Sequence, residues 1–258
     1  SEMCIRDRAL QIPMFGLYGA CSTSGEALAL ASMSAAAGYG GTMIAVTSSH
    51  FGSAEKEFRF PLGYANQRPL SSHWTVTGSG AFLVQSAEEY RKQNTKSYFS
   101  NIRITGVTVG KIVDYGLKDS QNMGACMAPA AMDTIVQNFQ DMERKEKDYD
   151  RIITGDLGSI GRTILFDLIR EKGYDICEKH MDCGMTIFDK ERQDTHAGGS
   201  GCGCAAVTLA SYVLPKLEKG EWKRVLFVPT GALMSTVSFN EGASVPGIAH
   251  GIVLESDA

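Results

Sequence analysis

The 258-residue sequence has no run of apolar residues long enough to cross a bilayer, which takes about 18–20 of them. It has no cluster of Lys and Arg, and its formal net charge of −4 argues against nucleic acid as a partner. Its seven cysteines follow no disulfide-framework spacing, and no signal-peptide pattern is present. We therefore expect reduced thiols inside a cell. An apolar content of 43% and a charged content of 21% are ordinary for a globular chain that buries a large core.

The first eight residues, SEMCIRDR, differ in character from the rest of the sequence. They are charged and carry no helical or strand period. We interpret residues 1–8 as a non-native, adapter-derived tail and leave them out of the fold prediction. The sequence that follows begins without a lead-in strand, so we expect a chain that lacks the first strands of its N-terminal half.

Hydrophobic periodicity and turn residues predict an α/β protein. The segments 23–37 and 199–217 are rich in small residues and predict two buried helices. Residues 50–75 predict a loop, and a loop of that length is more often functional than idle. The remaining predictions are strands at 42–49, 78–85, 101–116, 223–229 and 247–255, a helix at 123–142, and a strand–turn–helix unit at 148–173.

Two parts of the sequence repeat one order of elements. The segments 27–32 (ALALAS) and 206–211 (AVTLAS) share the pattern A-x-x-L-A-S, and each follows a Gly-rich turn. Each is then followed by a strand, a loop and a strand that opens with Gly. We therefore expect two similar halves, residues 9–116 and 117–258, with the two small-residue helices packed beside a pseudo-twofold axis.

Cys21 lies at the predicted N-terminus of the first of these helices. The unpaired N–H groups and the dipole of a helix favour a thiolate at that position. The repeat places His196 just before the partner helix, so we expect Cys21 and His196 to converge. A Cys–His pair can activate a sulfur nucleophile or bind an anion. A buried structural cysteine and a turn histidine explain the same spacing, and the sequence leaves both interpretations open.

Further polar residues follow predicted strands or flank the long loop. His50 ends a core strand, where α/β sheets present groups to ligands, although an exposed loop histidine fits equally. Asp156 also follows a strand, and its alternative role is to cap the next helix. Arg59 and Arg68 could clamp a carboxylate, or could be solvated on the loop.

The pair Cys202 and Cys204 has no second pair to complete a zinc site, so we expect no metal and interpret both as packing residues. We interpret His250, in the last predicted strand, as a core histidine with a hydrogen-bond partner.

The motifs GACS, GSGAFLV and PGIAHGIVLE resemble those of the thiolase and ketosynthase superfamily. From about Gln11 to the C-terminus, longer motifs resemble the stage V sporulation protein AD family of endospore-forming Firmicutes. These motifs are FGLYGACSTSGEAL, TSSHFGSAEKEFRFPLGYANQRP, KDSQNMGACMAPAAMDTI, TGDLGSIG, DTHAGGSGCGCAAV and EWKRVLFVPTGALMS. The resemblance implies a thiolase-like, layered α-β-α-β-α fold of two pseudo-duplicated halves.

The resemblance also implies a function. The protein would bind dipicolinic acid (pyridine-2,6-dicarboxylate), alone or as its calcium chelate, for uptake into the developing spore. It would act as a soluble, non-catalytic subunit without a cofactor, beside membrane proteins of the same sporulation operon. It would lie peripherally at the spore inner membrane, on the cytoplasmic side. Thiolase-like proteins are usually dimers, so a homodimer is also implied.

The sequence departs from the catalytic members of this superfamily at two points. Where condensing enzymes of the ketosynthase III kind carry His-Gln-Ala-Asn, it has TGDLGS. Where thiolases carry a second catalytic cysteine, it has NEGASVPGIAHG. We therefore expect a protein that is not an enzyme. The alternatives are an acyl-thioester transferase or condensing enzyme that uses Cys21, and a subunit that only scaffolds its partners.

The ligand-binding residues that we expect come from both halves of the chain. They are Cys21, His50, Arg59, Arg68, Asp156, His196, Gly198, Gly199 and Ser200.

Overall fold

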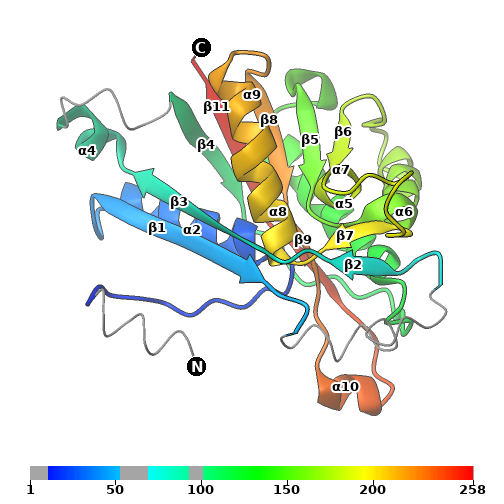
Figure 1. Ribbon diagram of the computed structural model, residues 1–258. Coiled ribbons are helices and arrows are strands. Elements are labelled where there is room, and N and C mark those ends of the chain that lie inside the picture. The colour runs from blue at the N-terminus through cyan, green and yellow to red at the C-terminus, as the bar shows by residue number, and fades with distance from the viewer. Residues whose placement is uncertain (1–10, 53–68, 93–100, 258) are drawn as a thin grey trace.

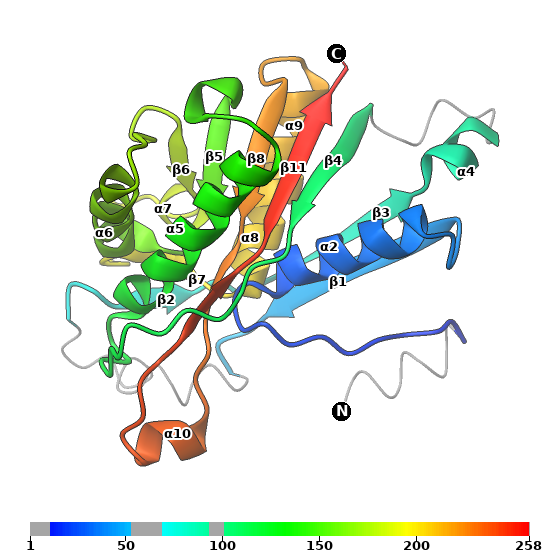
Figure 2. The ribbon, with the colours of Figure 1, turned by 180° about the vertical axis from the view of Figure 1, so that it is seen from behind.

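The computed structural model describes residues 11–52, 69–92 and 101–257. Four layers follow one another in this part of the chain: outer helices, a five-stranded sheet, a middle layer of helices and a two-stranded ribbon (Figures 1 and 2). The α/β class predicted from the sequence is confirmed. No helix among these residues is both long and apolar enough to span a membrane.

The five-stranded sheet has the order β4-β11-β8-β5-β6. Its strands are β4 (Ile102–Thr108), β5 (Arg151–Thr154), β6 (His180–Asp182), β8 (Arg224–Val228) and β11 (Gly251–Ser256). Strand β5 is parallel to β6 and β8, whereas β11 is antiparallel to β8 and β4. Strand β4, which the expected boundary at residue 116 groups with the first half, is thus an edge strand in the sheet of the second half.

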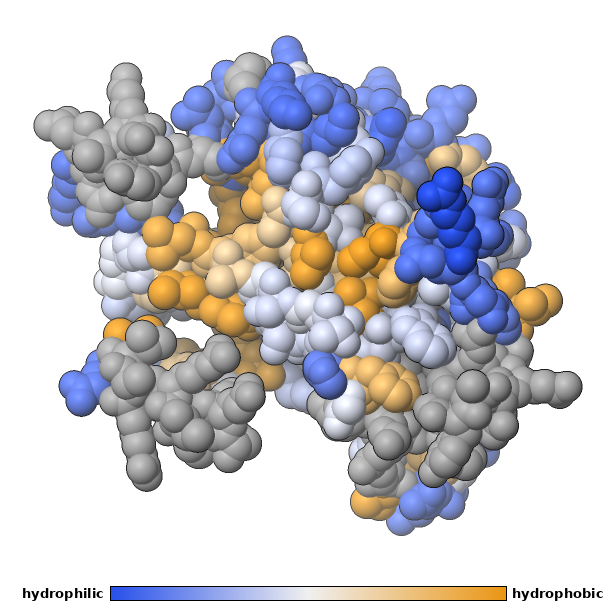
Figure 3. Space-filling model, viewed as in Figure 1, coloured by the Kyte–Doolittle hydropathy of each residue, from blue (hydrophilic) through white to orange (hydrophobic). Residues whose placement is uncertain are grey.

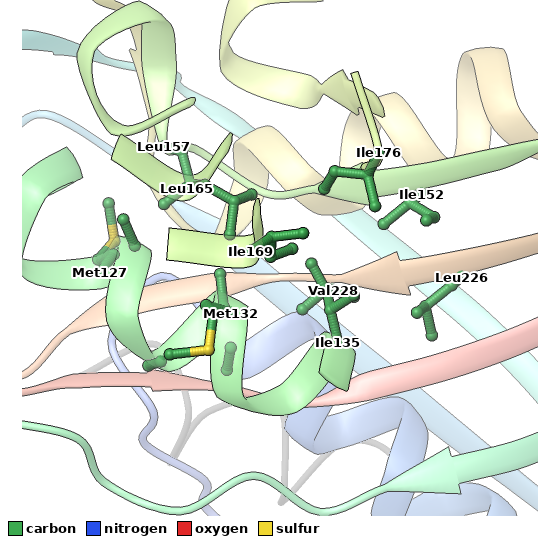
Figure 4. Close-up of a cluster of buried hydrophobic side chains, with 14 of the residues drawn as sticks. Met127, Met132, Ile135, Ile152, Leu157, Leu165, Ile169, Ile176, Leu226 and Val228 are labelled. Carbon is green, nitrogen blue, oxygen red and sulfur yellow. The ribbon is translucent and has the colours of Figure 1, made fainter. Parts of the chain in front are cut away.

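Helices α5 (Met123–Asp141) and α6 (Gly158–Glu171) cover one face of this sheet. They cross at two glycines: a Cβ on Gly124 would lie 2.4 Å from the carbonyl oxygen of Leu157, so only glycine permits this approach. The two helices and the sheet enclose the larger core. Figure 4 shows that core, which includes Met127, Met132, Ile135, Ile152, Leu157, Leu165, Ile169, Ile176, Leu226 and Val228.

The middle layer contains α2 (Thr23–Ala36) and a second helix that runs from α8 (Cys202–Thr208) through a π-helical turn (Leu209–Val213) into α9 (Leu214–Glu218). Pro215 has no N–H to donate and its ring crowds the preceding turn. The wider π turn relieves that crowding without ending the helix. Buried small residues of α2 and α8 pack between the two sheets, as the composition predicted.

Strands β1 (Thr42–Ser49) and β3 (Gly78–Gln85) form the antiparallel ribbon. The order helix, strand, antiparallel strand occurs in α2-β1-β3 and again in α8/α9-β8-β11, which confirms the internal repeat.

The two copies differ in what covers their outer faces. The cross-strand pair Ile44 and Leu83 of the ribbon is 57% and 51% exposed, whereas the corresponding pair Leu226 and Val253 lies fully buried beneath α5. Figure 3 shows hydrophobic residues gathered over β1 and β3.

Short elements complete the described chain. Strands β2 (His73–Thr75) and β7 (Gly198–Ser200) pair in parallel, and β9 (Thr230–Ala232) pairs antiparallel with β10 (Gly247–Ala249). Short helices are α4 (Ala87–Lys92), the 3-10 turn η2 (Glu146–Asp148), α7 (Cys183–Thr186) and α10 (Thr236–Asn240).

The sequence prediction was wrong at three element boundaries. The helix predicted from residue 199 begins at Cys202, because Gly198–Ser200 form β7. The loop predicted over 50–75 ends in β2, and the strand predicted over 101–116 ends at Thr108. A three-residue strand is too short to show a periodic pattern in the sequence. Its position is set by pairing with a strand from a distant part of the chain.

Candidate functional site

Cys21 lies on a tight turn immediately before α2 and is half-buried. Ser22 donates its backbone N–H and its hydroxyl to the carbonyl oxygen of Gly19, at 3.0 and 2.6 Å. Ala20 has a φ of 50°, a left-handed conformation that is costly for a residue with a side chain and is found most often at functional sites. This turn aims Cys21 away from the helix.

Strand β9 presses on this turn from the other half of the chain. A Cβ on Gly231 would lie 2.4 Å from the carbonyl oxygen of Gly19, so the position accepts only glycine. The turn before α2 and the β9–β10 pair are therefore in direct contact.

The group beside the thiol is the hydroxyl of Ser200, whose Oγ lies 3.7 Å from Cys21 Sγ. Ser200 is fully buried and donates its hydroxyl to Asp156 Oδ2 at 2.5 Å. Asp156, also buried, accepts from the backbone N–H of Gly201 at 2.9 Å and from the hydroxyl of Thr230 at 2.9 Å. We call Cys21, Asp156, Ser200, Gly201 and Thr230 the Cys21 site.

The direction of these hydrogen bonds determines what the thiol can do. A serine hydroxyl has one proton, and Ser200 gives it to the carboxylate of Asp156. Ser200 therefore presents a lone pair to Cys21 and accepts from the thiol. A hydrogen-bond acceptor at this position bonds the thiol without removing its proton, whereas nucleophilic catalysis requires a base or another group that favours the thiolate.

The N-terminus of α8 is already satisfied by the protein. Gly201 donates its N–H to Asp156, and Gly203 donates its N–H to Ser49 Oγ at 3.0 Å. The positive end of this helix is thus largely engaged with Asp156 and the end of β1, which leaves fewer of its N–H groups for an anion.

A second buried carboxyl, Asp182, lies next to the site at the end of β6. Its Oδ2 accepts from Thr154 Oγ1 and from the N–H of Leu157, and its Oδ1 accepts from the N–H groups of Gly158 and Met185. It therefore caps the start of α7 and of α6. Burial raises the pKa of Asp182 to about 6, while the bond from Thr154 opposes the rise.

His180, two residues before Asp182, is held as a neutral imidazole. Its Nε2 lies 3.0 Å from Thr154 Oγ1, and its ring packs edge-on against Phe166. Burial lowers the pKa of His180 from 6.5 to about 3, with a smaller contribution from the positive charge of Arg162.

This shift predicts a pH dependence of stability. The unfolded chain takes up a proton at His180 below pH 6.5 and the folded chain does not, so stability present above that pH is lost as the pH falls toward 3. Between pH 7 and pH 4 the wild type should therefore lose about 3 kcal/mol of its free energy of unfolding through His180. The variant His180→Gln lacks this histidine and should not show that loss. Urea unfolding at several pH values measures this. The matched control is His50→Gln, and parallel curves for wild type and His180→Gln would contradict the prediction.

The other predicted site residues occupy different surroundings. His196 is held through Nδ1 by the carbonyl oxygen of Pro69 at 2.9 Å and through Nε2 by Asp194 at 3.1 Å. His50 is exposed after β1 and accepts from the N–H of Gly52 at 2.9 Å. Arg59 and Arg68 lie outside the described residues.

Gly198 and Gly199 have a packing reason for lacking side chains. A Cβ on Gly198 would lie 2.7 Å from the carbonyl oxygen of Gly184, and one on Gly199 would lie 2.8 Å from a methyl of Val76. They let β7 pass between β2 and α7 and carry Ser200 to Cys21.

Two cysteines and one histidine of the sequence analysis lie outside the Cys21 site: Cys202, Cys204 and His250. Cys204 is fully buried in the core, and its pKa is raised well above the usual value by burial, which confirms its packing role. Cys202 is only half-buried, and its thiol donates to the carbonyl oxygen of Ser48 at 3.0 Å. His250 is buried and accepts from the N–H of Gly110 at 3.2 Å, as a core histidine should.

Three residues of this region, Gly201, Thr230 and Asp182, were missed by the sequence reasoning. The strands β5 and β8 are parallel neighbours. Asp156, which was predicted, lies two residues after the end of β5, and Thr230 lies two residues after the end of β8. Because carboxyl ends of parallel strands meet at one edge, this spacing could have predicted that the two side chains meet. Asp182 ends a strand too short to be predicted.

Solved structures identify the class of the fold. The tetronic acid condensing enzyme AbyA1 matches with a TM-score of 0.60 at 14% identity, over 98% of this chain and 73% of that one. The thiolase Acat5 of Ascaris suum gives 0.58 at 11% identity, over 96% and 82%. The 3-oxoacyl-[acyl-carrier-protein] synthase III of Aquifex aeolicus VF5 gives 0.56 at 12% identity, over 97% and 70%. The chain has the thiolase-like fold, as expected.

Sequence comparison then identifies the family. The profile of stage V sporulation protein AD matches residues 3–255. The stage V sporulation protein AD of Bacillus subtilis (strain 168) is 43% identical over 248 residues, which cover 96% of this chain and 70% of the relative. The chain belongs to the stage V sporulation protein AD family, and its role is in sporulation.

Proposed function

We propose that this sporulation protein binds dipicolinate at the Cys21 site without forming a covalent bond. The observation that carries the proposal is the bond from the Ser200 hydroxyl to Asp156, which leaves Ser200 as an acceptor for the thiol of Cys21. The resemblance to dipicolinate-binding proteins supplies the ligand. This contact gives the thiol a hydrogen-bond acceptor rather than a base that would remove its proton, which supports a binding role over catalysis.

The charge at the site favours one form of the ligand. The carboxylate of Asp156 lies behind Ser200, and free dipicolinate is a dianion that this charge repels. The calcium chelate of dipicolinate is formally neutral, because two carboxylates balance one divalent cation. We therefore propose that the chelate is the form that binds.

Titration calorimetry tests the proposal with dipicolinate in the presence of calcium and, separately, of a calcium chelator. We expect saturable binding that is tighter with calcium. Cys21→Ala and Ser200→Ala should each weaken it about tenfold, which corresponds to about 1.4 kcal/mol. The matched control, Cys177→Ala, changes a cysteine beyond α6 and should bind as the wild type does.

Two outcomes would contradict the proposal. One is equal affinity in the wild type, Cys21→Ala and Ser200→Ala, which would place the ligand elsewhere. The other is an acyl adduct on Cys21 after incubation with an acyl-coenzyme A, detected by intact mass. That result would favour the acyl-transfer alternative, for which the strained turn at Ala20 is the supporting feature.

The proposal extends to partners on the same grounds of resemblance. The bound dipicolinate would pass to membrane proteins of the same sporulation operon, with this protein as their peripheral subunit on the cytoplasmic side of the spore inner membrane.

A further inference from the structure

A cavity of about 330 Å³ lies at the β6 edge of the five-stranded sheet. Among the strands that the structure describes, β6 pairs with β5 alone, so it lies at the edge of the sheet. Side chains reach the cavity from both sides of that edge: Arg162 comes from α6, and Tyr212 comes from the π-helical turn of the middle layer. None of the five residues of the Cys21 site lines it.

Two arginines face this cavity without a carboxylate partner among the described residues. Arg151 donates to the carbonyl oxygen of Asp150 at 2.8 Å and lies over the ring of Trp222. Arg162 lies over the ring of Phe166, and its Nε is buried without a hydrogen-bond acceptor. A buried guanidinium donor that lacks an acceptor is unfavourable, and an anion that accepts from it removes this penalty.

The acidic and basic groups around the two arginines do not supply that anion. Asp182 is the carboxyl in the cavity wall, and its two oxygens already accept four hydrogen bonds from the protein. His180, also in the wall, is engaged with Thr154. The cavity wall therefore holds two arginines whose charges no described carboxylate pairs, and the Nε of one of them, Arg162, has no acceptor.

Two methionines, a threonine and two aromatic rings form the rest of the wall: Met181, Met185, Thr186, Tyr212 and Trp222. Tyr212 and Trp222 pack edge to face, with ring centres 5.9 Å apart, and Tyr212 is 42% exposed. Such rings favour a flat apolar body over a fully hydrated ion. The volume falls at the lower end of the range for small-molecule pockets, about 300–1,000 Å³.

We propose that this cavity is a second ligand site, which takes a planar aromatic carboxylate. Arg151 and Arg162 bind the carboxylate oxygens with charge-assisted hydrogen bonds, and Tyr212 and Trp222 pack against the ring. Dipicolinate belongs to this chemical class, so the proposed function supplies one candidate ligand. Binding here does not depend on binding at the Cys21 site.

The two tryptophans of the chain make the two sites separately observable. Trp222 lines the cavity, whereas Trp74 lies opposite Gly199 in the β2–β7 pair, one residue from Ser200. In Trp74→Phe, fluorescence reports on the cavity alone. In Trp222→Phe, it reports on the neighbourhood of the Cys21 site alone.

The experiment titrates Trp74→Phe with benzene-1,3-dicarboxylate, and separately with inorganic phosphate and benzyl alcohol. We expect a saturable change in Trp222 emission with the dicarboxylate and at least tenfold weaker binding of the other two probes. Arg162→Gln and Arg151→Gln should each weaken dicarboxylate binding at least tenfold. Arg170→Gln, at an exposed arginine of the same helix, is the matched control and should leave it unchanged.

Three results would overturn the proposal: no saturable Trp222 signal, unchanged affinity in a folded Arg162→Gln or Arg151→Gln protein, or phosphate binding as tight as the dicarboxylate. Circular dichroism establishes that each variant is folded. If dipicolinate changes the emission of Trp74 in Trp222→Phe while Trp222 stays silent in Trp74→Phe, the second site is overturned and the proposed function stands. If dipicolinate changes the emission of Trp222 alone, the second site stands and binding at the Cys21 site is overturned.

Discussion

Asp182→Ala is expected to lower the free energy of unfolding by about 5 kcal/mol, enough to unfold much of the population of an ordinary domain. The carboxyl accepts hydrogen bonds from Thr154 and from three backbone N–H groups, and it is almost fully buried. Each buried donor left without an acceptor costs about 1–3 kcal/mol, and water that enters the space recovers part of the loss. Urea unfolding followed by circular dichroism measures the change.

Two further variants, an intermediate and a control, test whether the loss of stability comes from the hydrogen bonds to Asp182. Asp182→Asn keeps one acceptor oxygen but turns an NH2 group toward backbone donors, so its loss should be intermediate. Asp167→Ala removes an exposed aspartate from α6 and should change stability by less than about 0.5 kcal/mol. If Asp182→Ala is as stable as Asp167→Ala, then Asp182 does not hold the starts of α6 and α7.

Asp156→Asn is expected to make the thiol of Cys21 more reactive. The substitution removes a negative charge and replaces one carboxylate oxygen by an NH2 group, which weakens the bond that now holds the Ser200 hydroxyl. Ser200 is then free to turn its proton toward Cys21 and to stabilise a thiolate. We expect alkylation of Cys21 by iodoacetamide at neutral pH to become about tenfold faster, which corresponds to about 1.4 kcal/mol.

The same variant should be less stable by about 2–3 kcal/mol, because Gly201 and Thr230 also donate to Asp156. Peptide mapping by mass spectrometry assigns the alkylation to Cys21, and Cys177 serves as the internal reference. An unchanged ratio of Cys21 to Cys177 labelling in a folded Asp156→Asn protein would show that the Ser200 bond does not control the thiol.

The sequence predicted those helices and strands whose residues follow a regular hydrophobic or small-residue pattern. Strands β1 and β3 match the predicted 42–49 and 78–85, and α2 ends one residue before the prediction. Alternating or small-residue patterns over eight or more residues fix such elements locally. The repeat could also be recognised, because both copies keep the same order of helix and strands.

The parts that could not be predicted depend on contacts between distant residues. Strand β7 exists because Gly198 pairs with His73, and no local pattern marks that pairing. At the site, Cys21 and Ser200 were both predicted, but the sequence could not say which group lies beside the thiol. The close approach that Gly231 permits sets that geometry, and it appears only once both halves are folded together.

The exposed side chains on the outer face of the β1–β3 ribbon make the repeat uneven in local stability. The first copy holds Ile44 and Leu83 in water, whereas the second holds Leu226 and Val253 beneath α5. Buried apolar contact sets how readily a segment opens on its own, so the first copy is the weaker cooperative unit. The turn that carries Cys21 belongs to that unit, while Ser200 and Asp156 lie in the stronger one. A local opening that starts at the ribbon therefore separates the thiol from its partners while most of the molecule remains folded.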